Sequence, residues 1–260
     1  GIKKYIIILE PEKRNTAPAI LSSALIDEVP NNQPLMFFPA DHLIEKNSFL
    51  TKSIDNCKSH LDSENIFIFG IKPINPSSNY GYFITKKINK NINKVIKFIE
   101  KPNQKKAKEV IAKNGYWNSG IVLARKDSII NNTKKVQKNL FDLCLKSISL
   151  AKKNKNIISL QKNYFKKIKP ISFDYAILEK SKEINSISLN LTWSDLGSWK
   201  EIFKIIKNQT TLKNIKKNTF YRPWGNYKNF FKGENFLLKE LTVNKKSSIS
   251  LQKHFYRAEH

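Results

Sequence analysis

The chain alternates short apolar runs with stretches of helical periodicity. Helical patterns cover an Asn15-capped segment to Leu25, Phe49–Leu61, Gln104–Ala112 and Leu140–Ala151. Strands separated by helices are typical of an α/β fold with a largely parallel sheet. The runs that predict strands are Tyr5–Leu9, Leu35–Phe38, Ile66–Ile71, Val95–Ile99, Ile121–Leu123 and Ile184–Leu191.

This pattern lapses between residues 208 and 218, where Asn, Gln, Thr and Lys dominate. Beyond that stretch, Phe236–Val243 and Ser248–Leu251 alternate like strands of an antiparallel unit. We therefore predict a domain over residues 1–207, a linker over 208–218 and the start of a β domain over 219–260.

The 260 residues carry 47 basic and 21 acidic side chains, a formal net charge of +26. Such a balance is compatible with nucleic-acid binding. However, only four of the basic residues are Arg, and the lysines are scattered among Asn and Ile without a dense arm of interleaved aromatics. We expect a solvated surface and no nucleic-acid partner. A basic nucleic-acid-binding protein is the alternative outside enzymes, and the salt dependence of binding separates the two.

Several other classes are disfavoured by motifs that the sequence lacks. No apolar run approaches the roughly 20 residues of a membrane-spanning helix, so no membrane partner is expected. Cys57 and Cys144 stand in no metal or redox spacing and no signal-peptide pattern is seen, which favours the cytoplasm. The glycines form neither GxGxxG nor a Walker A loop, and no GxSxG turn offers a nucleophile.

Two carboxylates follow predicted strands, where open α/β sheets bind ligands. Asp41 comes after the run Leu35–Ala40, and Asp195 follows the last predicted strand of the first domain. Asp41 is well placed to hold Mg²⁺. The alternatives are an N-cap of the next helix for Asp41 and a turn residue for Asp195.

Two further polar groups lie between these carboxylates in the sequence. Glu100 and Lys101 stand at the tip of a strand that Pro102 ends, and such a pair can hold a sugar hydroxyl and a phosphate. A surface ion pair is the alternative. Asn118 offers an amide that donates and accepts hydrogen bonds, and Gly120 beside it permits close approach.

Taken together, these motifs resemble the mannose-1-phosphate guanylyltransferases of the long, bifunctional bacterial type. In that family a sugar nucleotidyltransferase domain precedes a mannose-6-phosphate isomerase domain of the cupin type. Residues Tyr221–Gly225, Ser250–Gln252 and Arg257–His260 resemble the opening of the isomerase domain. The first domain's matching segments are Glu10-Pro11, Arg14–Ile20, Pro39–His42, Tyr80–Tyr82, Glu100–Pro102, Trp117–Gly120, Phe173–Ala176 with Glu179-Lys180, and Trp193–Trp199.

The resemblance implies a Rossmann-like, GT-A-like nucleotidyltransferase domain with a mixed, mostly parallel sheet, followed by a truncated cupin segment. The implied reaction converts GTP and mannose 1-phosphate to GDP-mannose and pyrophosphate, in nucleotide-sugar biosynthesis for polysaccharides. Another sugar 1-phosphate or base is the alternative among enzymes, and a homo-oligomer is compatible with the sequence. The implied roles are Mg²⁺ binding for Asp41 and Asp195, sugar-phosphate contact for Lys101, sugar binding for Gly81, Glu100 and Asn118, and nucleotide contact for Glu10, Arg14 and Asn15.

The sequence departs from the family at two places. The family's loop, GGxGTRxxP-like, has no counterpart here, so we expect the sequence to start downstream of it and the chain as given to make no GDP-mannose. In the cupin segment, His254 and Glu259 fit a metal site, but Tyr256 occupies the second histidine position. We expect that site to be incomplete and isomerase activity to be absent.

Overall fold

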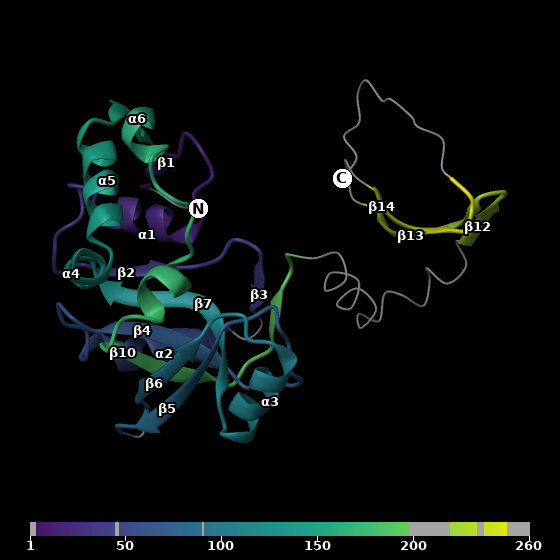
Figure 1. Ribbon diagram of the computed structural model, residues 1–260, viewed down its shortest axis with the longest axis horizontal. Helices are drawn as coiled ribbons and strands as arrows, with labels where there is room; N and C mark the ends of the chain where they lie inside the picture. The colour runs from purple at the N-terminus through teal and green to yellow at the C-terminus, as the bar shows by residue number, and fades with distance from the viewer. Residues whose placement is uncertain (1–3, 45–46, 90, 198–218, 233–236, 249–260) are drawn as a thin grey trace. The chain divides into compact units, whose positions relative to one another are not determined.

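The computed structural model describes residues 4–44, 47–89, 91–197, 219–232 and 237–248 (Figure 1). The chain divides into two compact units, Gly1–Trp193 and Ser194–His260, and each is described by itself. The division falls within the short strand β11 (Trp193–Asp195). The helices in these described ranges are all too short or too polar to cross a membrane.

A six-stranded mixed sheet forms the centre of the first unit, in the order β2-β7-β4-β10-β6-β5. The predicted mixed sheet with flanking helices is therefore confirmed. The expectation of mostly parallel pairing is wrong, because β4 and β10 form this sheet's one parallel pair within the described residues and its other described pairs are antiparallel. The strands are β2 (Pro34–Phe37), β4 (Ile66–Ile71), β5 (Tyr82–Lys87), β6 (Asn93–Ile99), β7 (Tyr116–Arg125) and β10 (Ile184–Leu189).

Burial on both faces explains the error in strand direction. Every residue of β4 is buried; Ile66 and Ile68 face one hydrophobic cluster, whereas Phe67 and Phe69 face another. A strand covered on both faces has a continuous apolar run whether its neighbours are parallel or antiparallel. The apolar run therefore indicates burial but not direction.

Helices cover both faces of this sheet (Figure 1). On one side, α1 (Thr16–Ala24), α4 (Lys126–Val136) and α5 (Lys138–Ser149) contribute to the first cluster. On the other, α2 (Asn47–Lys58) and α3 (Gln104–Ala112) contribute to the second. The predicted helices are confirmed, with α3 matching residue for residue.

Helix α4 was not predicted because part of its buried face is polar. The side chains of Ser128 and Asn132 donate hydrogen bonds to the carbonyl oxygens of Asn65 and Glu64, at 2.8 and 2.7 Å. Thr133 is also buried and donates to the carbonyl of Ile129. Such residues satisfy buried backbone groups but weaken the apolar periodicity that predicts a helix.

Short elements surround this core. Strand β1 (Ile7–Leu9) pairs in parallel with β9 (Ile157–Ser159), which also pairs with β8 (Lys152–Asn154). Strand β3 (His42–Ile44) pairs with β11. Two short helices, α6 (Lys162–Phe165) and the π-helix η1 (Asp174–Leu178), precede β10.

The second unit contains an antiparallel sheet of β12 (Thr219–Arg222), β13 (Gly225–Lys232) and β14 (Leu237–Val243). Strand β14 coincides closely with the strand predicted from Phe236. The predicted linker at 208–218, the domain boundary at 207 and most of the strand at Ser248–Leu251 lie outside the described residues. His254 and Glu259 also lie outside them.

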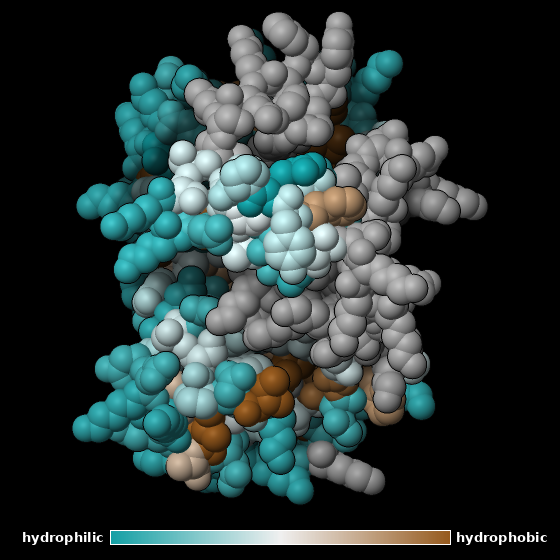
Figure 2. Space-filling view, turned by 90° about the vertical axis from the view of Figure 1, so that its right-hand side faces the viewer, coloured by the Kyte–Doolittle hydropathy of each residue, from teal (hydrophilic) through white to brown (hydrophobic). Residues whose placement is uncertain are grey.

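Hydrophilic side chains predominate on the described part of the face in Figure 2, and the hydrophobic groups form small, separate patches. This agrees with the expected solvated surface.

Candidate functional site

The segment carrying Asp41 crosses strand β7 at Gly120. Gly120 has φ +72°, and a Cβ atom there would lie 3.0 Å from Pro39 Cγ and 3.5 Å from His42 Cε1. A glycine therefore supplies both the left-handed backbone and the space for this crossing. The crossing places Asp41 immediately before β3, so the alternative of a cap on α2, which begins at Asn47, is wrong.

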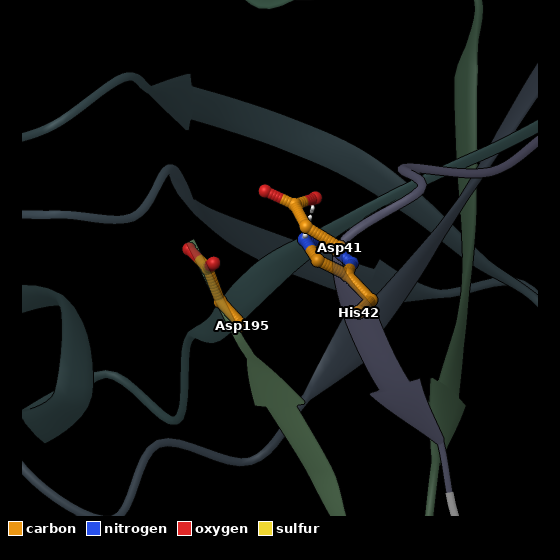
Figure 3. A group of neighbouring side chains, drawn as sticks. All are labelled: Asp41, His42 and Asp195. Carbon is orange, nitrogen blue, oxygen red and sulfur yellow. Dashed lines mark ion pairs between the residues drawn. The ribbon is translucent and has the colours of Figure 1, made fainter. Parts of the chain in front are cut away.

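Asp41, His42 and Asp195 lie together (Figure 3). One carboxylate oxygen of each aspartate and one ring nitrogen of His42 all lie within 4.8 Å of one another. Asp41 is exposed, whereas the other two are partly buried. The Oδ1 atom of Asp195 also accepts a hydrogen bond from the Gly197 amide at 2.7 Å, so its turn role coexists with this grouping.

The hydrogen bonds of His42 determine which atoms of this group can bind a metal. The indole Nε1–H of Trp193 donates to His42 Nδ1 at 3.2 Å. Since an indole nitrogen only donates, a neutral His42 carries its proton on Nε2, which lies 3.9 Å from Asp41 Oδ1. The two carboxylates are then the available ligands, and carboxylate oxygens suit Mg²⁺.

A second group forms around Gly81. A Cβ atom on Gly81 would lie 2.5 Å from Glu100 Oε2 and 3.5 Å from Asn118 Cβ. The backbone N–H of Asn118 donates a hydrogen bond to the backbone carbonyl of Gly81 at 2.7 Å. The structure therefore brings together the three residues for which the family resemblance implies sugar binding.

Glu100 and Lys101 differ strongly in exposure. The Glu100 side chain is 8% exposed, whereas that of Lys101 is 59% exposed, and Lys101 Nζ lies 4.0 Å from Glu100 Oε1. Burial, followed by the charge of Asp174, raises the pKa of Glu100 to about 7. Glu100 and Lys101 thus form an ion pair, as the alternative supposed, but its acid is buried and only its ammonium is exposed.

The sequence reasoning gave no role to Asp174 or Glu179, yet both contact this group. Asn118 Nδ2 donates to Asp174 Oδ1 at 2.6 Å, and the Glu100 amide donates to Glu179 Oε1 at 2.9 Å. Both acids lie in the segment quoted for the family resemblance, which was the one signal that could have singled them out.

Aromatic rings connect the two groups. Tyr80 packs edge-on against Trp117 and Trp193, with ring centroids 5.0 and 5.2 Å apart. Trp193 also packs against His42 at 5.1 Å. Packed rings thus link His42 to Tyr80 and Trp117, the residues that precede Gly81 and Asn118.

The residues predicted to contact nucleotide make other contacts in this structure. Arg14 Nη2 donates to the carbonyl of Lys166 at 2.6 Å and pairs with Glu12, and the Asn15 side chain caps α1. Burial raises the pKa of Glu10, whose charge acts on the buried Cys144. These contacts stabilise the start of α1 and its surroundings, and the nucleotide roles stay predictions.

The fold alone does not define an activity, so the class of protein is taken from comparison with known families. Residues 3–211 match the family model described as "Nucleotidyl transferase", and the chain belongs to this family. Residues 208–260 match the model described as "Mannose-6-phosphate isomerase C-terminal". The protein is therefore a nucleotidyltransferase with an isomerase-type C-terminal segment, which confirms the resemblance.

Similar proteins agree with this assignment. The xanthan biosynthesis protein XanB of Xanthomonas campestris pv. campestris is 27% identical over 326 residues, covering 100% of this chain and 70% of XanB. The mannose-1-phosphate guanylyltransferase of Escherichia coli K12 is 26% identical, covering 98% of this chain and 69% of that protein. A crystal structure of mannose-6-phosphate isomerase from Helicobacter pylori is similar with a TM-score of 0.68 at 26% identity, covering 75% of this chain and 76% of that one.

Proposed function

We propose that this protein acts in GDP-mannose synthesis, with GTP and mannose 1-phosphate as substrates and pyrophosphate as the second product. The observation that carries the proposal is the convergence of Glu100, Asn118 and Gly81 beside Lys101. The similarity to the mannose-1-phosphate guanylyltransferase of Escherichia coli supports mannose and guanine among the sugars and bases that this family could use.

The Gly81 group would bind the sugar phosphate. The ionised Glu100 carboxylate accepts hydrogen bonds from sugar hydroxyls, and the Asn118 amide can accept or donate. Lys101 extends an exposed ammonium that can reach the phosphate. Gly81 leaves room for the Glu100 carboxylate, which a larger residue would displace.

Asp41 and Asp195 would hold Mg²⁺, since carboxylate oxygens fit its preference and one from each residue lies within 4.8 Å of the other. When bound, this ion offsets the negative charge on the phosphates in phosphoryl-type transfer. The sugar phosphate itself supplies the attacking oxygen, so the protein's task is to orient it for in-line attack at the α-phosphorus. Cys57 and Cys144 offer no alternative nucleophile, because burial raises the pKa of each thiol to about 12.

Guanine recognition is proposed for Glu10. A carboxylate can accept hydrogen bonds from both N1–H and the N2 amino group of guanine, a pair that adenine does not offer. This role is supported by the family resemblance of the Glu10-Pro11 segment and by the position of Glu10 directly after strand β1.

Calorimetric titration of the protein with mannose 1-phosphate, in the presence of Mg²⁺, tests the sugar half of the site. Binding is measured because the family's glycine-rich loop has no counterpart in the sequence. We expect Lys101→Ala to weaken binding about 10-fold or more, as for loss of a hydrogen bond to a charged group. Lys105→Ala, which removes another lysine on nearby α3, should leave it unchanged.

Glucose 1-phosphate and mannose 6-phosphate serve as competing ligands in the same titration. Failure of the wild-type chain to bind mannose 1-phosphate, or equal binding of all three sugar phosphates, would overturn the proposed substrate. Equal affinities in Lys101→Ala and Lys105→Ala would remove Lys101 from the site.

A further inference from the structure

The side-chain amide of Asn118 is held from a distant part of the chain. Asn118 is 7% exposed in strand β7, and its Nδ2 donates to Asp174 Oδ1 at 2.6 Å. Its Oδ1 accepts a long hydrogen bond from the Gly120 amide at 3.3 Å. An ionised carboxylate only accepts hydrogen bonds, so Asp174 determines which end of the Asn118 amide faces it.

We propose that Asp174 is a positioning residue of the sugar site, which fixes the Asn118 amide and sets the pH range in which Glu100 accepts hydrogen bonds from the substrate. The inference rests on the proposed sugar-phosphate function of the Gly81 group. Asp174 acts through Asn118 and Glu100.

The charged groups around Glu100 explain the second part of this role. After burial, the charge of Asp174 raises the pKa of Glu100 most, Lys101 lowers it and Glu179 raises it further. Asp174 itself has a pKa raised by burial and by Glu179, which its hydrogen bond from Asn118 and the charge of Lys101 oppose. Below about pH 7 Glu100 holds a proton, so one of its oxygens becomes a hydrogen-bond donor and the carboxyl group accepts fewer hydrogen bonds.

A purely structural role for Asp174 is the competing explanation. Asp174 is the first residue of η1, and its carbonyl accepts a hydrogen bond from the Glu179 amide at 2.9 Å. Loss of the side chain could therefore disturb η1 alone. Asp174→Asn separates the two explanations, because it keeps the shape and an accepting oxygen for Asn118 but removes the charge.

The test combines two measurements on Asp174→Asn and Asp174→Ala. The ionisation of Glu100 is followed without ligand by carbon-13 NMR of its carboxyl group. Mannose 1-phosphate affinity is then measured by calorimetry from about pH 5 to about pH 9. Asp142→Asn is the matched control, since Asp142 pairs with Lys138 in an exposed ion pair on helix α5.

We expect Asp174→Asn to move the Glu100 midpoint, and with it the acidic limb of the affinity profile, to lower pH. Asp174→Ala should weaken binding about 10-fold even at high pH, the effect of a lost hydrogen bond to a charged group. The second ionisation of the ligand's phosphate is common to all variants and cancels in the comparison.

An unchanged Glu100 midpoint in Asp174→Asn would overturn the electrostatic role, and wild-type affinity in a folded Asp174→Ala would overturn the positioning role. If the wild-type chain binds no mannose 1-phosphate, the proposed function fails instead. The ligand-free NMR titration still decides the coupling of Asp174 to Glu100 in that case.

Discussion

Gly81 and Glu100 lie so close that a methyl group on Gly81 would come within 2.5 Å of Glu100 Oε2. The atom in the way is the end of a flexible side chain, so an added methyl group would displace the carboxylate instead of the backbone. The position of this buried acid in the proposed sugar site thus depends on the absence of a side chain at residue 81.

Gly81→Ala should therefore reduce sugar-phosphate binding more than it reduces stability. We expect mannose 1-phosphate affinity to fall about 10-fold, because the displaced carboxylate loses its hydrogen bonds to the ligand. Calorimetry measures the affinity and urea unfolding measures the free energy of unfolding. An affinity equal to wild type would show that Glu100 does not contact the sugar.

Gly120→Ala should reduce stability more than it reduces sugar-phosphate binding. Its φ of +72° is unfavourable for alanine, and the nearest atom, Pro39 Cγ at 3.0 Å, belongs to a rigid ring. We expect the free energy of unfolding to fall by about 1–3 kcal/mol, the cost of a strained backbone conformation. Urea unfolding of both variants measures this loss. A smaller loss of unfolding free energy in Gly120→Ala than in Gly81→Ala would contradict the prediction.

Glu100 should make stability depend on pH in a defined direction. Its pKa rises from its ordinary value to about 7 on folding, so between those values the folded protein binds more protons than the unfolded chain. Stability then falls as pH rises through this window. Unfolding at a series of pH values should show a shallower fall in Glu100→Gln than in wild type.

Glu109→Gln is the control for that series, because Glu109 is an exposed acid on α3 that pairs with Lys106. Its pKa is lowered, so it contributes no fall in stability over the same window. Identical pH profiles for Glu100→Gln and wild type would show that Glu100 ionises normally.

Metal binding should depend on the two aspartates and not on the imidazole. Titration with Mn²⁺, followed by its paramagnetic resonance signal, should give affinities about 10-fold or more weaker for Asp41→Asn and Asp195→Asn, since each loses a charged ligand. His42→Gln should stay near wild type, because His42 Nδ1 is occupied by Trp193. Strong loss in His42→Gln alone would make the imidazole a ligand.

Local pattern was sufficient for much of the fold. The boundaries of β4 and α3 follow from apolar runs and helical periodicity, and Asn15 caps α1 as its position suggests. The approach of Asp41 to Asp195 was also predictable in outline, because both follow predicted strands. Each of these conclusions depends on a few neighbouring residues, and short-range sequence patterns report such interactions directly.

Strand direction, polar helix α4 and the contact between Asn118 and Asp174 were decided by the tertiary structure alone. Asn118 and Asp174 are 56 residues apart, and no spacing marks them as partners. An apolar run reports that a segment is buried, but its partners depend on the path of the whole chain. The sequence by itself therefore determined the elements and most candidate residues, whereas the tertiary structure decided which of them meet and how their charges interact.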